Sequence, residues 1–90
     1  MITIYKYPIY MTDSQVLTIK GYNGLLSVIE QKDRLVVYSY VDTENKEPVK
    51  VNIAIKGTGH LVEEEIKNTW SFLGTVQMRS GLVCHVNYFV

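Results

Sequence analysis

The strongest constraint on the fold of this chain is an apolar alternation with a period of two over residues 49–56, which read "VKVNIAIK". Successive side chains of a β-strand point to opposite faces of a sheet, so such a pattern predicts a strand with one buried face. The residues expected to face the core are Val49, Val51, Ile53 and Ile55. The residues expected to face water are Lys50, Asn52, Ala54 and Lys56.

A second strand is predicted over residues 34–42, "RLVVYSYVD", which are apolar or aromatic on both faces. A strand of this kind lies at the centre of a sheet or is covered on both sides. Shorter runs of similar character occur at 2–10, 15–20, 25–31, 71–78 and 82–90. Together they predict a single domain over residues 1–90, a mainly β fold of about seven short antiparallel strands arranged as a β sandwich or small barrel.

The connections between the runs predict hairpins. Short polar links, "QKDR" at 31–34 and "RSG" at 79–81, indicate antiparallel hairpins, so neighbouring strands are expected to pair in sequence order. Residues 42–48, "DTENKEP", are expected to form a longer exposed hairpin loop. One short helix or 3₁₀ turn is predicted near residues 60–69, although the consecutive glutamates there also suit a solvated loop.

Charge and composition exclude several classes of function. Nine basic and nine acidic residues give a formal net charge of zero, which argues against non-specific nucleic-acid binding. No run approaches the roughly 18–20 apolar residues of a membrane span, and the first ten residues lack the unbroken apolar stretch of a signal peptide. Cys84, the one cysteine, lies in an apolar run. These features predict a cytoplasmic protein without membrane contact.

The last predicted strand favours self-association. Residues 82–90, "LVCHVNYFV", are largely apolar, and an exposed sheet edge of that composition is usually covered by another copy of the chain. A homo-oligomer is therefore predicted, with a dimer as the minimum.

The loop "KGTGH" at residues 56–60 is the candidate ligand site. Gly57 and Gly59 allow successive N–H groups to face one side, Thr58 adds a hydroxyl, and His60 adds a ring donor or a positive charge. With Lys56 as a charge partner, these residues would form a phosphate cradle. The alternative is that the glycines only end the preceding strand and His60 caps a turn.

Aromatic residues supply candidates for stacking a nucleobase. Tyr5, Tyr7, Trp70 and His85 are the candidates, since planar side chains stack on bases. The tyrosines suit a core or a subunit interface equally well.

No catalytic or metal-binding set is expected. His85 and Cys84 are adjacent on a predicted strand and therefore point to opposite faces, so they neither chelate together nor form a nucleophile and base. Consecutive glutamates at 63–65 do not form the facing pair that acid and base chemistry requires. The chain is predicted to be no enzyme and to have no metal and no cofactor.

The order of several motifs resembles that of a family of small bacteriophage and prophage proteins. These motifs are "IYKYP" at 4–8, "GTGH" at 57–60, "FLGTVQ" at 72–77 and "GLVCHV" at 81–86. The resemblance covers nearly the whole chain and implies a phage protein acting in the cytoplasm of an infected bacterium. It implies no particular activity.

These observations lead to a functional hypothesis. Small phage proteins of this kind include anti-defence sponges, which sequester a nucleotide second messenger without cleaving it. The chain is accordingly expected to bind a phosphate-bearing small molecule, such as a cyclic oligonucleotide or an ADP-ribose derivative, at a subunit interface. The alternatives are a protein-binding inhibitor or accessory factor that docks through an apolar β edge, and a small nucleotide hydrolase.

Overall fold

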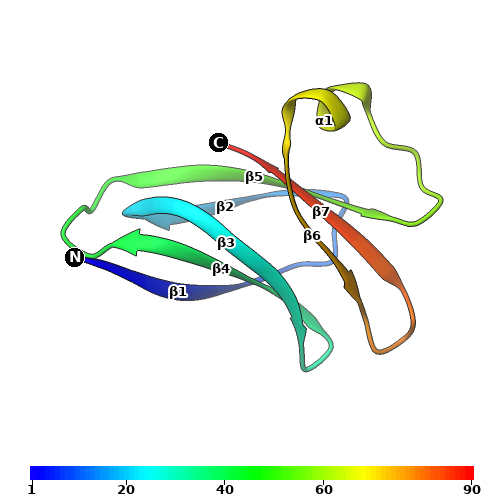
Figure 1. Cartoon of the computed structure of the whole chain (residues 1–90), viewed down its shortest axis with the longest axis horizontal. Coiled ribbons are helices and arrows are strands. Elements are labelled where there is room, and N and C mark those ends of the chain that lie inside the picture. Colours follow the sequence, from blue (N-terminus) through cyan, green and yellow to red (C-terminus); the bar gives the residue numbers. More distant parts are fainter.

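A computed structural model describes residues 1–90 as seven antiparallel strands in two sheets with one short helix (Figure 1). The predicted mainly β fold is thus confirmed. The strands are β1 (Ile2–Ile9), β2 (Ser14–Lys20), β3 (Tyr22–Gln31), β4 (Arg34–Asp42), β5 (Pro48–Gly57), β6 (Ser71–Gln77) and β7 (Val83–Phe89). The helix is α1 (Glu64–Thr69). The molecule is flat, with extents of 41 × 31 × 16 Å.

The smaller sheet has the order β1-β4-β3, so β4 is central as its two apolar faces predict. β3 and β4 form the hairpin expected from "QKDR". Lys32 and Asp33 at its tip have φ values of 52° and 61°. Two successive positive values are typical of the tight type I′ turn, whose twist matches that of the flanking strands.

The larger sheet has the order β2-β5-β7-β6, and β6 and β7 form the second predicted hairpin. Pairing in sequence order is wrong for the other strands, because β1 pairs with β4 and β2 pairs with β5. The prediction of a hairpin loop at 42–48 is also wrong, since this segment passes from one sheet to the other. Gly21 makes a similar passage between β2 and β3 at a φ of 71°, where a Cβ would clash with the Asp42 carbonyl oxygen.

The last strand does not lie at an edge, contrary to the sequence prediction. β7 is hydrogen-bonded to β5 on one side and to β6 on the other. Its apolar composition is therefore explained by an interior position in the sheet. The four edge strands are β1 and β3 of the smaller sheet and β2 and β6 of the larger one. β3 and β6 lie next to each other, which closes one side of the sandwich.

The core lies between the two sheets and consists mainly of branched apolar side chains, with contributions from every strand. Its members are Ile9, Ile19, Val28, Leu35, Val37, Val41, Val51, Ile53, Ile55, Val76, Met78, Cys84 and Val86. The predicted core residues of β5 are among them, except that Val49 is only partly buried and packs against the cluster. Alternate residues of each strand point toward this core, which accounts for the period of two in the sequence.

α1 covers one end of the outer face of the larger sheet, whereas Val16, Phe72 and Phe89 elsewhere on this face are exposed. Ile66 on the helix is buried, and residues 54 and 56 of β5 lie beneath it in a hollow that Trp70 also lines. Ala54 is 1% exposed and Lys56 is 4% exposed, so the prediction that both face water is wrong. A period-two pattern locates one face of a strand but does not reveal a helix that packs on the other face. The helix is six residues long, and none in the structure is long and apolar enough to cross a membrane.

The outer face of the smaller sheet has no such cover. In the register of β1, β3 and β4, the outward side chains include several apolar ones that are between 37% and 50% exposed. These are Ile2, Ile4, Leu26, Ile29 and Tyr40. We call this set the outer apolar patch. Monomeric proteins rarely expose a contiguous apolar surface of this kind without a use for it.

Candidate functional site

The loop at residues 57–60 begins where β5 ends. Thr58, Gly59 and His60 are exposed, and Gly59 has a φ of 89°, a left-handed conformation that favours glycine. Nothing lies within 4 Å of the position that a Cβ of Gly59 would occupy. A ligand can therefore approach the backbone at Gly59 without displacing any side chain.

Most N–H groups of this loop are used within the fold. The N–H of Gly57 donates to Nδ1 of His60 at 3.3 Å, and the N–H of His60 donates to the carbonyl oxygen of Gly57 at 3.0 Å. The N–H of Thr58 donates to the carbonyl oxygen of Val83 at 3.3 Å. Only the N–H of Gly59 has no acceptor in the chain. The loop is thus a well-formed turn that offers one backbone donor to a ligand.

The imidazole of His60 lies over Gly57. A Cβ at position 57 would be 2.9 Å from Cε1 of His60, so glycine is required there for the ring to pack against the backbone. Because Nδ1 accepts a hydrogen bond from Gly57, the proton of the neutral ring resides on Nε2. His60 therefore offers a ring N–H donor in the same loop as the free N–H of Gly59.

Lys56, the predicted charge partner, is held elsewhere. Its Nζ lies 2.8 Å from Oδ1 of Asp13 and 3.1 Å from Oε2 of Glu63. The hydrogen bond to Asp13 is the main cause that raises the pKa of Lys56, against the opposing effect of burial. The ammonium is thus charged and already matched by two carboxylates. It links the loop before β2 to the segment that enters α1.

His85 forms a hydrogen-bonded chain with two threonines. Its Nε2 lies 2.8 Å from Oγ1 of Thr58, and its Nδ1 lies 3.0 Å from Oγ1 of Thr75. One ring nitrogen donates and the other accepts, and no carboxylate orients the ring. Thr75 was not singled out from the sequence, although the pairing of β6 with β7 places it directly opposite His85. The hydrogen bond with the His85 ring in β7 holds the side chain of Thr58, and this stabilises the conformation of the loop.

A cavity of about 240 Å³ adjoins the loop. Apolar and polar groups of four segments line it: Met11, Thr12, Asp13, Ile55, Gly57, His60, Leu82 and Cys84. Burial raises the pKa of the Cys84 thiol, so this wall of the cavity is neutral. The contribution of residues 11–13 was not predictable from the sequence, because a loop between strands of different sheets shows no periodicity that would indicate where it folds.

The predicted residues do not all meet at this cavity. Gly57 and His60 line it, whereas the stacking candidates do not. Tyr7 packs against the core, where burial raises its pKa with a smaller contribution from Tyr5. Trp70 stacks on Phe89 at the end of α1, with ring centroids 6.0 Å apart. No group of three or more His, Cys, Asp or Glu side chains is placed to hold a metal ion.

A family model spans almost the whole of this sequence. It matches residues 1–89 and is described as a domain of unknown function, DUF7352. The chain belongs to the DUF7352 family. No curated protein and no solved structure matches it. The two sheets, the loop and the cavity all lie within the matched residues, so they are features of a DUF7352 domain.

Proposed function

We propose that this DUF7352 protein is a non-enzymatic binding protein that captures a phosphate-bearing small molecule of the nucleotide type. The observation that carries the proposal is the cavity beside the loop at residues 57–60. Its wall is apolar at Ile55 and Leu82, and its rim holds polar groups of Asp13 and His60. Small-molecule sites commonly combine a concave apolar surface with a few convergent polar groups.

The loop supports a phosphate as the polar part of the ligand. The N–H of Gly59 and the Nε2 donor of His60 are free, and the backbone at Gly59 is open to approach. Asp13 opposes an anion, and the Lys56 ammonium 2.8 Å away offsets its charge only in part, because Lys56 also pairs with Glu63. A phage-encoded sponge for a cyclic oligonucleotide or an ADP-ribose derivative remains our leading assignment, because binding of this kind needs no catalytic group.

Calorimetric titration with cyclic dinucleotides and ADP-ribose species tests this assignment. We expect a member of the panel to bind more tightly than about 1 mM, which corresponds to about 4 kcal/mol. His60→Ala should abolish this binding while the thermal unfolding midpoint stays close to that of the wild type. A panel without any binder at that level would refute the assignment for these ligands.

Recovery of the ligand after heat denaturation separates sequestration from hydrolysis. Intact ligand is expected, because the Thr58 hydroxyl and the imidazole of His85 lack the carboxylate that orients the base in a hydrolytic triad. Appearance of a cleaved product would favour the hydrolase alternative. Thr58→Val would then be the variant that identifies the nucleophile.

A second candidate function is binding to a protein through the smaller sheet. The outer apolar patch favours it, since edge strand β1 also contributes exposed apolar side chains at Ile2 and Ile4. The same patch supports our proposal of a homo-oligomer. Light scattering of the wild type and of Ile4→Lys distinguishes these roles, because only self-association predicts that the variant has a lower mass in the absence of other proteins.

A further inference from the structure

A second hollow lies at the other sheet of the molecule, where the outer face of β1, β3 and β4 meets the hairpin turn. Its volume is about 190 Å³. It is lined by three cationic side chains, one amide and two apolar residues: Lys6, Lys32, Arg34, Gln31, Pro8 and Val36. We call it the basic hollow. None of its lining residues belongs to the loop or to the cavity described above.

The strand register brings these residues together. On the outer face, Pro8 of β1 is opposite Val36 of β4, and Arg34 of β4 is opposite Gln31 of β3. Lys6 precedes Pro8 by two residues and so lies on the same face of β1. Its Nζ lies 3.5 Å from Oε1 of Gln31. Lys32 occupies the first position of the tight turn. The basic charges therefore come from two strands and a turn with a defined conformation.

The cations of the basic hollow have no anionic partner. Lys6, Lys32 and Arg34 form no ion pair, and no carboxylate lines the hollow. The acidic residue that precedes Gln31, Glu30, accepts a hydrogen bond from the N–H of Asp33 and lies 3.7 Å from Nε of Arg79. Asp33, the turn residue between Lys32 and Arg34, does not line the hollow, so the lining itself carries an excess of positive charge.

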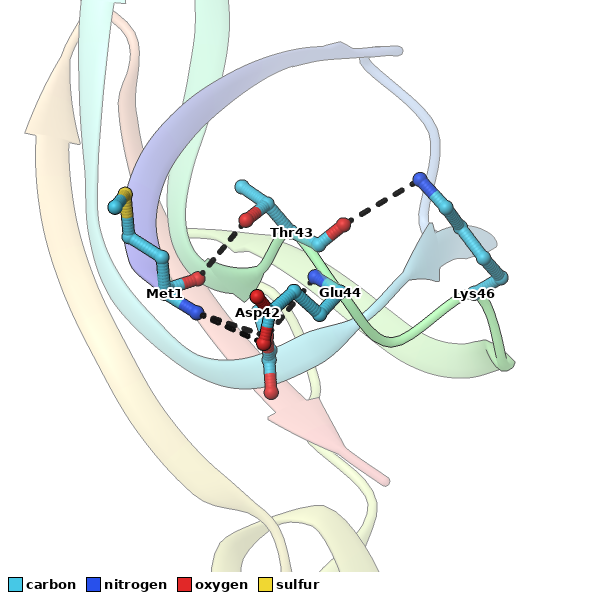
Figure 2. A network of polar contacts seen from close by, with 5 residues as sticks. All are labelled: Met1, Asp42, Thr43, Glu44 and Lys46. Atoms are coloured by element: carbon cyan, nitrogen blue, oxygen red, sulfur yellow. Dashed lines mark hydrogen bonds and ion pairs between the residues drawn. The ribbon is translucent and has the colours of Figure 1, made fainter.

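The opposite end of the same sheet provides a contrast. Lys20 and Lys46 line a hollow there, but Asp42 lines it as well. Figure 2 shows how acidic and backbone groups are engaged at this end: the amine of Met1 lies 3.5 Å from Asp42, and Lys46 donates to the carbonyl oxygen of Thr43. Lys20 of β2 and Lys46 of the segment between β4 and β5 thus share their hollow with a carboxylate, whereas no carboxylate lines the basic hollow.

We propose that the basic hollow is a binding site for an oligophosphate, that is, two or more linked phosphates. The guanidinium of Arg34 suits two oxygens of one phosphate, and the ammonium groups of Lys6 and Lys32 act as point charges for further oxygens. Pro8 and Val36 form an apolar floor that contributes no competing negative charge. This inference goes beyond the proposed function, because it does not require the loop at residues 57–60 to bind an anion.

Titration of ¹⁵N-labelled protein with inorganic tripolyphosphate at low salt tests the site. We expect chemical shift changes centred on residues 6 and 31–34, which weaken as salt is added because exposed charges are screened. In the triple variant K6Q/K32Q/R34Q the affinity should fall at least about tenfold, or more than about 1.4 kcal/mol. The matched control K20Q/K46Q/K50Q removes the same charge elsewhere and should retain the affinity of the wild type to within about twofold.

Each contrary result identifies a different error. An equal loss in both triple variants would mean that net charge alone attracts the probe, which overturns the site. Absence of binding by the wild type would also overturn it. Loss of tripolyphosphate binding in His60→Ala, with binding kept in K6Q/K32Q/R34Q, would assign the anion to the loop and refute the basic hollow.

A comparison of inorganic pyrophosphate with ADP identifies the source of the phosphates. Equal affinity for the two probes, lost in K6Q/K32Q/R34Q, would support a site for the phosphate chain alone. Tighter binding of ADP, lost in the same variant, would support a nucleotide site in which Tyr38, opposite Lys6 in the register, contacts the base.

Discussion

Lys56, beneath α1 on the larger sheet, and Lys6, on the outer face of the smaller sheet, occupy opposite environments. On the larger sheet, Lys56 lies beneath α1 and binds the carboxylates of Asp13 and Glu63. On the smaller sheet, Lys6 is exposed on a face that no helix covers and has no carboxylate partner. A strand lysine that a helix buries thus has a structural role, whereas a strand lysine that no helix covers is available to bind a ligand.

This difference shows how cover determines the role of a charge. A lysine that is removed from water must be matched, because an unpaired buried charge is costly. A lysine that stays in water contributes little to stability, and its charge remains free to attract an anion. The following three predictions test this contrast, beginning with the largest expected effect.

Lys56→Ala should lower the free energy of unfolding by about 3 kcal/mol, mainly because it removes the packing of a lysine stem that lies buried beneath α1. Its two carboxylate partners are largely exposed, so the lost ion pairs contribute less. Chemical denaturation measures the free energy of unfolding. The matched control is Lys6→Ala, a strand lysine on the uncovered sheet, which should change the free energy by less than about 0.5 kcal/mol. Similar losses in both variants would contradict the contrast between the sheets.

Ile66→Ala should lower the free energy of unfolding by about 2 kcal/mol, since Ile66 is the buried residue of α1 and its truncation leaves a void above β5. Trp70, the one tryptophan, reports on the helix, so its fluorescence should shift to longer wavelength as the cover loosens. Ile4→Ala in the outer apolar patch is the control, and its free energy of unfolding should stay within about 0.5 kcal/mol of the wild type. An unchanged free energy of unfolding and unchanged Trp70 emission in Ile66→Ala would show that burial of Ile66 does not hold α1 on the sheet.

The smallest effect expected is a dependence of stability on pH from the same ion pairs. A hydrogen bond from its own backbone N–H and a second one from Lys56 lower the pKa of Glu63, so its contribution is present above its ordinary value of 4.5 and is lost as the pH falls below it. The hydrogen bond with Asp13 raises the pKa of Lys56, so that contribution is lost as the pH rises above 10.5. Both carboxylates are largely exposed, so solvent weakens the effect.

Unfolding measured from pH 3 to pH 11.5, in roughly half-unit steps, tests this dependence. In Lys56→Met the decline on the alkaline side should be reduced, because the titrating ammonium is gone. If the free energy of unfolding depends on pH identically in the variant and the wild type, the ion pairs of Lys56 are not the cause of that dependence.

Local pattern was sufficient to predict most strands and both hairpins. The alternation in β5 and the apolar faces of β4 result from burial of these strands. Short polar links between two strands favour a hairpin. The pairing of β1 with β4 and of β2 with β5 was not predictable in this way, because it joins segments that lie far apart in the sequence. The interior position of β7 has the same explanation.

The candidate site was predictable only in part. The glycines at 57 and 59 and His60 stand out in the sequence, and two of these three residues line the cavity. Asp13 and Thr75 did not stand out. Thr75 reaches the site only through the pairing of β6 with β7, and Asp13 only because its loop connects strands of different sheets. The basic hollow was missed for a related reason: residues 6, 32 and 34 share no common motif, and only the register of three strands brings them to one place.

The interior position of β7 has a consequence for how the protein is made. β7 is the last of the seven strands to be synthesised, yet it is the one that joins β5 to β6. Until it emerges from the ribosome, β2 with β5 and the segment of β6 expose apolar residues and unpaired backbone groups, which are the features that promote aggregation. The larger sheet must therefore assemble after translation of β7, whereas the hairpin of β3 and β4 can form while the chain is still being synthesised.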